Sequence, residues 1–321
     1  MQPELKVFIP EVEEPESLKR LQGLAEIKTG MVGQAYTEDD LAREMLDVEV
    51  VVITSQHRIT RNVIERSPKL RGIVKYGSRP GSDNVDMAAA NEKKILVAYT
   101  EGANSDSVAE FAIMLAFALI KRLPNAMTQM RNHAWRDSSC LGIEMAEKTF
   151  GILGLGVIGS KVAHKLNGFG VRVIATDPYI SKQKADLVHA SLVGLEDLLR
   201  ESDVLSLHAK VTDETRHMIG KKELGLMKRT AYLINTARGA LTDEQALYQA
   251  LRDGRIAGAA LDAFETEPPS LDNPLLKLSN VISTPHIASW TSDALQKEAN
   301  LAMEEVRDIL LGIRPQHLAN P

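Results

Sequence analysis

Short apolar runs rich in Val, Ile and Leu alternate with stretches of helical periodicity along this chain of 321 residues. Within each run the apolar residues are nearly continuous instead of occupying every second position. Such strands are buried on both faces, as in a parallel sheet that helices cover on both sides. The pattern therefore predicts an α/β fold of doubly wound sheets. The expected strands are residues 6–9, 48–53, 72–74, 95–97, 149–153, 171–174, 204–207, 231–234, 258–261 and 281–283.

The runs form two series, separated by a loop near residue 103. A long helix is expected after this loop, over residues 105–123. It is apolar almost all round, which indicates burial on several sides. A second subunit would supply part of that cover, and we expect a homodimer. No strand follows the last predicted helix, residues 292–311, which we expect to return to the first domain.

The segment Gly154–Gly159 has the spacing Gly-x-Gly-x-x-Gly and lies between a predicted strand and a predicted helix, residues 157–166. The first glycine permits a tight turn, the second lets a pyrophosphate approach the backbone, and the third lets helix and strand pack closely. Asp177 ends the next strand, 23 positions after Gly154, near the spacing of about 20 for an acid that binds the adenosine ribose. This context favours an NAD site over a chance glycine turn, and Asp177 would repel the 2′-phosphate of NADP.

Three later segments each follow a predicted strand, where residues of a doubly wound sheet face the ligand crevice. They contain Arg238, two acids at Glu265 and Glu267, and His286. Taken singly, each is a common surface or loop residue. Together they fit hydride removal from an alcohol carbon. A histidine takes the hydroxyl proton, a neighbouring carboxylate stabilises the imidazolium, and an arginine binds the substrate carboxylate.

With these motifs in place, the chain resembles the D-isomer-specific 2-hydroxyacid dehydrogenases, and within them the phosphoglycerate dehydrogenase-like branch. The resemblance covers nearly the whole chain, with the motifs in the family's order. They are residues 83–86, 102–110, 151–156, 235–239 and 260–264. The resemblance implies a flavodoxin-like substrate domain, residues 1–103 plus 291–321, and a Rossmann NAD-binding domain, residues 104–290.

The resemblance also implies site residues. The catalytic triad would be Arg238, Glu267 and His286, with Glu267 preferred to Glu265 because the family's acid directly precedes a proline. The implied cofactor contacts are Ser78, Gly154, Gly156, Val157, Ile158, Gly159, Asp177, His208, Ala209, Thr236, Ala237 and Asp262, the last to the carboxamide. The implied substrate contacts are Ser55, Gln56, Lys75, Gly77 and Arg79.

Around the substrate the sequence departs from the family's pattern. The glycine-rich loop before Asp83 is lengthened and spans residues 77–82. Lys210 stands where a proline is usual, and Ala288 stands where a glycine is usual, with the bulky Trp290 after it. These changes bear on the identity of the substrate more than on the chemistry.

Phosphoglycerate is the first substrate to test. Similar enzymes carry Arg where Thr54 stands and a second basic residue where Lys75 stands, and here only the second is basic. His57, Arg58 and Arg79 are candidates to bind a phosphate or a second carboxylate, although both arginines are equally well explained as solvated loop charges. We expect NAD-dependent interconversion of a small polar D-2-hydroxy acid and its 2-keto acid. The candidates are 3-phosphoglycerate, hydroxypyruvate or glyoxylate, and a sugar acid.

Two other functions are weighed against this one. A catalytically silent NAD-sensing binding protein is the alternative, because transcriptional corepressors resemble this family too. The intact triad and the absence of disordered extensions argue against it. A formate dehydrogenase-like enzyme would carry Gln in place of the acid, so Glu267 disfavours that possibility.

Composition limits the partners and the location. The chain has a net charge of −5 and a pI near 6.0, with basic and acidic residues interspersed. It therefore lacks the concentration of positive charge that binds nucleic acid. The longest apolar run, residues 111–120, is too short for a spanning helix of about 20 residues. The first residues show no signal-peptide pattern, so we expect a cytoplasmic protein. The single cysteine, Cys140, excludes an internal disulfide and a cysteine-cluster metal site, and no metal is expected.

Overall fold

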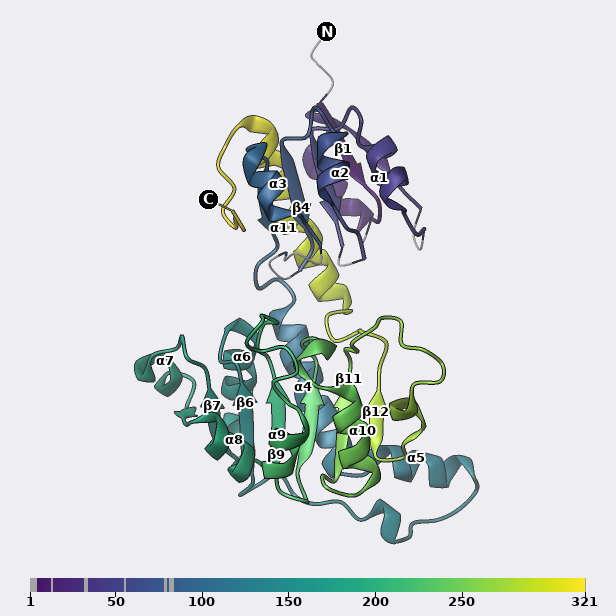
Figure 1. Cartoon of the computed structure of the whole chain (residues 1–321), viewed down its shortest axis with the longest axis vertical. Coiled ribbons are helices and arrows are strands. Elements are labelled where there is room, and N and C mark those ends of the chain that lie inside the picture. Colours follow the sequence, from purple (N-terminus) through teal and green to yellow (C-terminus); the bar gives the residue numbers. More distant parts are fainter. Residues whose placement is uncertain are drawn as a thin grey trace. The chain divides into compact units, whose positions relative to one another are not determined.

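The computed structural model describes residues 5–12, 14–31, 34–54, 56–77, 80 and 84–320. The chain divides into two compact units (Figure 1). The first unit combines Met1–Asn104 with Trp290–Pro321, and the second is Ser105–Ser289. Each unit is built on one parallel sheet with helices packed on it. This confirms the predicted fold class of two doubly wound α/β domains.

The first unit has a five-stranded sheet in the order β2-β1-β3-β4-β5, with every neighbouring pair parallel. This is the strand order of flavodoxin-like folds. Helices α1 to α3 pack on one face, and α11 packs on the other face with the short helix η1. The strands are β1 (Leu5–Ile9), β2 (Ala25–Thr29), β3 (Val50–Ile53), β4 (Gly72–Lys75) and β5 (Leu96–Tyr99). The helices are η1 (Pro15–Leu21), α1 (Glu38–Glu44), α2 (Arg61–Glu65), α3 (Met87–Glu92) and α11 (Ser292–Leu311).

The second unit has a seven-stranded parallel sheet in the order β12-β11-β10-β9-β6-β7-β8. Counted from β6, this is the Rossmann order 3-2-1-4-5-6 with one further strand at the edge. Helices α4 and α6 cover one face, and α8, α9 and α10 cover the other. The strands are β6 (Thr149–Leu153), β7 (Arg172–Thr176), β8 (Ser191–Leu192), β9 (Val204–Leu207), β10 (Tyr232–Asn235), β11 (Gly258–Leu261) and β12 (Val281–Ser283).

The helices of the second unit include four short 3₁₀ segments, which lie in the loops between the longer elements. The α-helices are α4 (Ser105–Ile120), α5 (Leu123–Arg131), α6 (Val157–Leu166), α7 (Lys182–Asp186), α8 (Leu195–Glu201), α9 (Lys221–Leu226) and α10 (Glu244–Arg252). The 3₁₀ segments are η2 (Ser138–Cys140), η3 (Asn167–Phe169), η4 (Gly239–Leu241) and η5 (Pro274–Lys277).

The helix expected over residues 105–123 ends earlier than predicted, at Ile120. Arg122 adopts a left-handed conformation with φ of 53°, and α5 then starts with Pro124 in its first turn. A proline cannot donate to the carbonyl four residues before it, and its ring clashes with that carbonyl. For Pro124 this carbonyl is that of Ile120, which instead accepts a 2.9 Å hydrogen bond from the Ile143 N–H.

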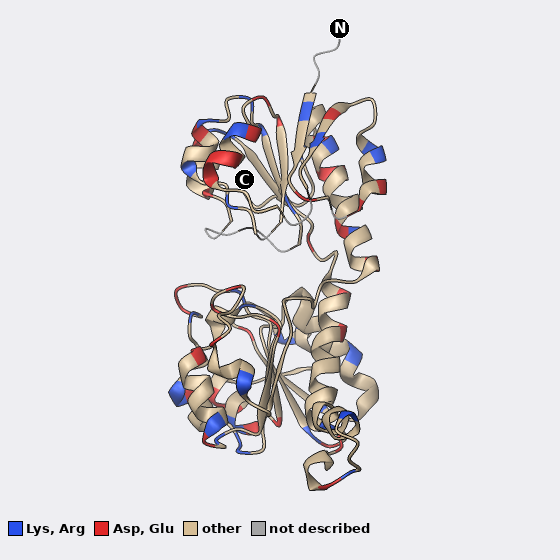
Figure 2. Cartoon of the chain, turned by 90° about the vertical axis from the view of Figure 1, so that its right-hand side faces the viewer, with Lys and Arg blue, Asp and Glu red and all other residues tan. Residues whose placement is uncertain are grey.

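Basic and acidic residues are intermixed on the helices of both units, as Figure 2 shows. Many of them form local pairs, such as Arg61 with Glu92 and Lys165 with Glu110. Exposed pairs of this kind contribute little to stability. In the described part of the chain, no helix combines the length and apolar character needed to cross a membrane.

Candidate active site and cofactor site

Polar side chains gather where the parallel strands of the second unit end. In a doubly wound sheet the ligand crevice opens at the carboxyl ends of the strands, where neighbouring strands send their connections to opposite faces. Here that position lies between β6 and β9, which are paired in the centre of the sheet. Gly154 directly follows β6, and His208 directly follows β9. The glycine turn therefore lies at the crevice that the strand order defines.

The geometry of the turn explains its three glycines. Gly154 has φ of +92°, and a Cβ there would lie 2.7 Å from the Ala209 nitrogen. A Cβ at Gly159 would lie 2.1 Å from the carbonyl oxygen of Gly154, so α6 packs directly on the turn. A Cβ at Gly156 would meet nothing within 4 Å. The fold therefore does not need glycine at residue 156, and the open space beside it suits a pyrophosphate.

The start of α6 adds hydrogen-bond donors to this open space. Gly156 is the N-cap of the helix and has no side chain to accept hydrogen bonds from the N–H groups of the first turn. This turn includes Val157 and Ile158. Free N–H groups and the positive end of the helix dipole bind phosphate groups. The residues present thus fit the diphosphate of a dinucleotide.

Asp177, just beyond β7, is fixed beside the same turn. One carboxylate oxygen accepts the Leu155 N–H at 2.8 Å, and the other accepts the Tyr179 N–H at 2.9 Å. An ionised carboxylate offers about four acceptor positions. Asp177 therefore keeps acceptor capacity for the hydroxyls of a ribose placed against the turn.

His208 and Thr236 continue the lining of the crevice. Ser206 Oγ lies 2.8 Å from His208 Nε2, and burial lowers the pKa of His208 to about 4, so the imidazole is neutral at neutral pH. The hydroxyl of Thr236 is buried and has no hydrogen-bond partner among the described residues. A buried hydroxyl normally has a partner, so Thr236 suits a contact with bound cofactor.

His286 and Glu267 form a close pair in the loops that follow β12 and β11. Glu267 Oε2 lies 2.7 Å from His286 Nδ1, and Glu267 Oε1 accepts the Phe264 N–H at 3.0 Å. Burial by itself raises the pKa of Glu267, but the hydrogen bond and charge of His286 outweigh it, helped by the Phe264 N–H and the Arg238 guanidinium. The pKa of Glu267 is therefore below its usual range. With Nδ1 held by the carboxylate, Nε2 is the nitrogen left for a substrate.

Asp262 positions the loop that carries His286. Its carboxylate is buried and accepts three hydrogen bonds, from the Thr284 hydroxyl at 2.6 Å and from the N–H groups of Ile287 and Ala288 at 2.9 and 2.8 Å. The Ser107 hydroxyl, in the first turn of α4, donates to the Ala288 carbonyl at 2.8 Å. The contact of Asp262 with the cofactor carboxamide stays a prediction.

Arg238 follows β10 and lies in a turn that Asn235 closes. The Asn235 amide donates to the Arg238 carbonyl at 2.8 Å and accepts the Ala237 N–H at 3.0 Å. A Cβ at Gly239 would lie 1.9 Å from the carbonyl carbon of Phe264. Glycine at this position lets the arginine loop touch the loop that carries Glu267. Arg238, Glu267 and His286 thus occupy the same edge of one sheet.

Of the predicted substrate contacts in the first unit, Ser55 and Arg79 lie outside the described residues, as does the cofactor candidate Ser78. Gln56 is exposed, and Lys75 is 2% exposed with its ammonium donating to the Tyr76 carbonyl at 3.1 Å.

Gly77, the last of these predicted contacts, has φ of +81° and donates its N–H to the Thr100 hydroxyl at 2.6 Å. A positive φ of this size favours glycine. The residue is therefore explained by the backbone conformation, and its contact with a substrate stays a prediction.

His57, also a candidate to bind a phosphate or a second carboxylate, has partners within its own unit, and its contact with a substrate stays a prediction. The side chain is buried, its Nδ1 lies 3.0 Å from the Thr54 hydroxyl, and its ring lies against Tyr36. Burial lowers the pKa of His57, which keeps the ring neutral at neutral pH. His57 therefore stabilises its own loop and supplies no positive charge.

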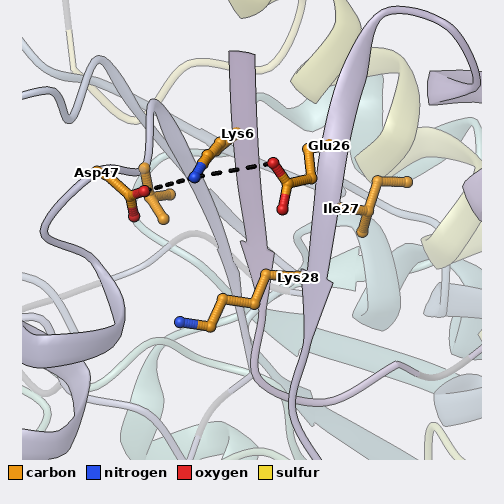
Figure 3. A pocket seen from close by; sticks show the side chains of 6 residues that line it. Lys6, Glu26, Ile27, Lys28 and Asp47 are labelled. Carbon is orange, nitrogen blue, oxygen red and sulfur yellow. Dashed lines mark hydrogen bonds and ion pairs between the residues drawn. The ribbon is translucent and has the colours of Figure 1, made fainter. Parts of the chain in front are cut away.

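A surface hollow of the first unit (Figure 3) lies away from the carboxyl ends of β3 and β4, where Gln56, Lys75 and Gly77 stand. Lys6 Nζ lies 2.6 Å from Asp47 and 3.7 Å from Glu26 across it. Lys6 and Glu26 stand near the starts of β1 and β2, so the hollow is at the amino ends of the strands. Its charges are already paired, Lys6 with Asp47 and Glu26 and Lys28 with Glu44 outside the hollow, and no predicted site residue lines it. No cluster of His, Cys, Asp or Glu among the described residues suits a metal ion.

A Rossmann sheet with its glycine turn and acid, beside an Arg and a His–Glu pair, is the arrangement of a nucleotide-dependent dehydrogenase. Residues 113–288 match the family model described as "D-isomer specific 2-hydroxyacid dehydrogenase, NAD binding domain". The chain belongs to the D-isomer specific 2-hydroxyacid dehydrogenase family, and this match covers its NAD-binding domain.

Two curated relatives illustrate the similarity. The glyoxylate reductase of Aeropyrum pernix is 36% identical over 98% of this chain and 96% of its own length. The D-3-phosphoglycerate dehydrogenase of Methanocaldococcus jannaschii is 38% identical over 98% of this chain. This chain spans only 59% of the length of that relative, and the same share of the D-3-phosphoglycerate dehydrogenase of Archaeoglobus fulgidus.

Solved structures have the same fold. The TT0316 protein from Thermus thermophilus superposes with a TM-score of 0.91 at 32% identity, covering 98% of this chain and 99% of its own. D-lactate dehydrogenase from Aquifex aeolicus, solved with NAD and lactic acid, gives a TM-score of 0.83 at 30% identity, with 96% of each chain covered. The likeness extends over both units of the chain.

Proposed function

We propose that this protein interconverts a small polar D-2-hydroxy acid and its 2-keto acid by NAD-dependent hydride transfer. The observation that carries the proposal is the 2.7 Å contact between Glu267 and His286 Nδ1, at the same sheet edge as Arg238 and the glycine turn. This contact supports His286 as the general base, Glu267 as its carboxylate partner and Arg238 as the cation beside them.

The residues divide the chemistry among them. In the oxidation direction, His286 Nε2 takes the proton of the substrate hydroxyl, and in reduction it returns one. Glu267 stabilises the imidazolium and fixes the orientation of the ring. Arg238 binds the substrate carboxylate and stabilises the negative charge that develops on the carbonyl oxygen. NAD, when bound, supplies the hydride acceptor.

For the substrate, we favour glyoxylate or hydroxypyruvate over 3-phosphoglycerate, and a sugar acid stays a candidate. A phosphate needs cations that reach it, and two predicted candidates do not offer an exposed charge. Lys75 is buried, and His57 is buried with a lowered pKa. The relatives named glyoxylate reductase and hydroxypyruvate reductase support this choice. Arg58 and Arg79 remain candidates for a phosphate.

The test is consumption of NADH across a panel of 2-keto acids, with NADPH in parallel. We expect His286→Ala to lower kcat/KM by about 10² to 10⁴-fold, the usual contribution of a general acid or base. Arg238→Ala should raise KM and lower kcat together. His164→Ala is the matched control, because His164 is exposed on α6. Full activity in His286→Ala would refute the mechanism.

The alternative, a catalytically silent NAD-sensing protein, makes a different prediction. Such a protein would bind NADH tightly and turn over no member of the panel. The presence of all three catalytic candidates at one sheet edge supports the enzyme instead.

We further propose that the protein is a homodimer in the cytoplasm. Large apolar side chains on and after α5, such as Met130, Trp135 and Leu141, are 60 to 78% exposed, which supports a covering subunit. A single cysteine in 321 residues suits a reducing compartment.

A further inference from the structure

Glu244 and Glu265 exchange hydrogen bonds between the start of α10 and the loop after β11. The Glu265 N–H donates to Glu244 Oε1 at 2.6 Å, and the Glu244 N–H donates to Glu265 Oε1 at 3.0 Å. Each glutamate thus binds the backbone of the other. Such a reciprocal pair fixes the distance between two segments that are 21 residues apart.

Two further residues extend this Glu244–Glu265 pair. Glu244 Oε2 accepts from the Asn273 amide at 2.9 Å, and Glu265 Oε2 lies 3.3 Å from His217 Nε2. The backbone N–H of His217 donates to the Ala240 carbonyl at 2.7 Å. Ala240 follows Arg238 by two residues. His217 therefore links the arginine loop, through its backbone, to Glu265, through its side chain.

The Glu244–Glu265 pair holds the peptide of Phe264 and Glu265. This peptide contacts the arginine loop at Gly239 and binds the Glu267 carboxylate. A Cβ at Gly239 would lie 1.9 and 2.2 Å from backbone atoms of Phe264 and Glu265. The Phe264 N–H donates to Glu267 Oε1 at 3.0 Å. A shift of residues 264–265 would therefore move Glu267 away from His286 and open the contact with the arginine loop.

Capping of α10 accounts for only one of the two bonds, the one from the Glu244 N–H to Glu265. Asp243 is already the N-cap, and its carboxylate accepts the Ala246 N–H at 2.9 Å. The bond from the Glu265 N–H to Glu244 satisfies no backbone group of α10, because the donor belongs to the loop. Its effect is on the position of the acid loop.

We propose that Glu244 and Glu265, together with His217, are positioning residues that hold the acid loop against the arginine loop. They set the geometry of Glu267, and through it His286, without touching substrate or cofactor. The catalytic consequence rests on the proposed function, whereas the effect on the loop does not.

The experiment compares Glu265→Ala and Glu244→Ala with Asp272→Ala. Asp272 is an acid of the same region whose side chain is 99% exposed, so it is a matched control. We expect kcat for the preferred keto acid to fall about 10 to 100-fold in the first two variants, since a misplacement of about 1 Å can cost 10²-fold. KM for NADH should stay within about twofold, because the glycine turn is unaffected.

Hydrogen exchange followed by mass spectrometry supplies a second readout that needs no activity. Peptides covering residues 262–268 and 236–242 should exchange faster in Glu265→Ala, and a peptide covering residues 150–160 should not. Glu265→Gln keeps an acceptor for the Glu244 N–H and should recover most of the lost kcat. The double variant should be no worse than the worse single variant, because either change breaks the same pair.

Wild-type exchange and wild-type kcat in Glu265→Ala would overturn the proposal, as would additive losses in the double variant. If Glu265→Ala does not fold, Glu244→Ala carries the same test. If the unmodified protein turns over no keto acid, the proposed function fails, and the exchange of residues 262–268 still decides whether the pair positions the loop.

Discussion

Two buried polar side chains, Asn235 and Asp262, stand at the carboxyl ends of the neighbouring strands β10 and β11 and are each 1% exposed. Between them they accept or donate five hydrogen bonds to the loops that carry Arg238 and His286. A buried polar group without a partner costs about 1–3 kcal/mol. Each side chain therefore stabilises one loop conformation strongly over others. The loops of the proposed catalytic residues Arg238 and His286 thus depend on neighbouring side chains that have no proposed part in the chemistry.

The lowered pKa of His208 predicts how the stability of the folded chain depends on pH. Its pKa of about 4 in the folded chain lies below the ordinary value of 6.5, so protons bind more readily to the unfolded chain. The stability that the neutral ring contributes is fully present above pH 6.5 and is lost as the pH falls toward 4. At pH 5 the loss is about 2 kcal/mol. We expect urea unfolding to show that His208→Gln loses less stability than wild type between pH 7 and pH 5.

The control for this measurement is His164→Gln, an exposed histidine on α6. It should follow the wild-type dependence on pH. Parallel curves for wild type and His208→Gln would show that the ring is not buried as a neutral group. His57, whose pKa burial also lowers, adds to the slope in both proteins and does not affect their difference.

At the scale of elements, the β6–turn–α6 unit predicts opposite outcomes for two glycines of one motif. Gly159→Ala brings a Cβ to 2.1 Å from the Gly154 carbonyl, which forces α6 away from β6. We expect a loss of about 1–3 kcal/mol in unfolding free energy and weaker NADH binding. Gly156→Ala meets nothing within 4 Å. It should leave stability nearly unchanged and weaken NADH binding by about tenfold or more, or about 1.4 kcal/mol.

Thermal unfolding and NADH fluorescence titration on the same preparations separate the two effects. A Gly156→Ala variant that binds NADH normally would contradict the placement of the pyrophosphate beside residue 156. Gly168→Ala serves as a control, because its Cβ also meets nothing within 4 Å and it lies in η3, beyond the end of α6 that is far from the turn.

The sequence predicted the central strands of both sheets because their residues are buried on both faces and give continuous apolar runs. It did not predict β2 or β8, which lie at sheet edges. β2 (Ala25–Thr29) alternates with charged residues and has no buried position, and β8 (Ser191–Leu192) is only two residues long. Their pairing depends on the neighbouring strand and not on their own composition.

The candidate site likewise contains residues that the sequence predicts and residues whose role depends on contacts elsewhere in the chain. Arg238, Glu267 and His286 are the proposed catalytic residues, and short motifs mark them in the sequence. The sequence offered two acids, and the structure places Glu267 beside His286 and Glu265 beside Glu244. The positioning roles of Asn235, Glu244 and Glu265 were not predicted, because they depend on contacts between loops far apart in the chain. The sequence signal of the close approach between the arginine loop and the acid loop was Gly239, directly after Arg238.

At the scale of the whole molecule, the segment from α5 to residue 143 lacks a covering element among the described residues. No residue of α5 is buried, and Figure 1 shows the helix and the chain after it extending from the sheet of the second unit. Gln129 and Asp137 tie the segment together by a 2.8 Å hydrogen bond. The exposure of Met130, Trp135 and Leu141 in this segment supports the proposed homodimer.

The corresponding prediction is a dimer in sedimentation equilibrium, with twice the chain mass of 35.3 kDa. Met130→Lys combined with Leu141→Lys places two charges on the exposed apolar surface and should give monomers, because desolvating a charge without a partner is costly. Leu271→Lys is the matched control, since Leu271 is 91% exposed and lies outside the segment. A wild-type protein of 35.3 kDa at micromolar concentration, or a double variant that stays dimeric, would contradict this assignment of the surface.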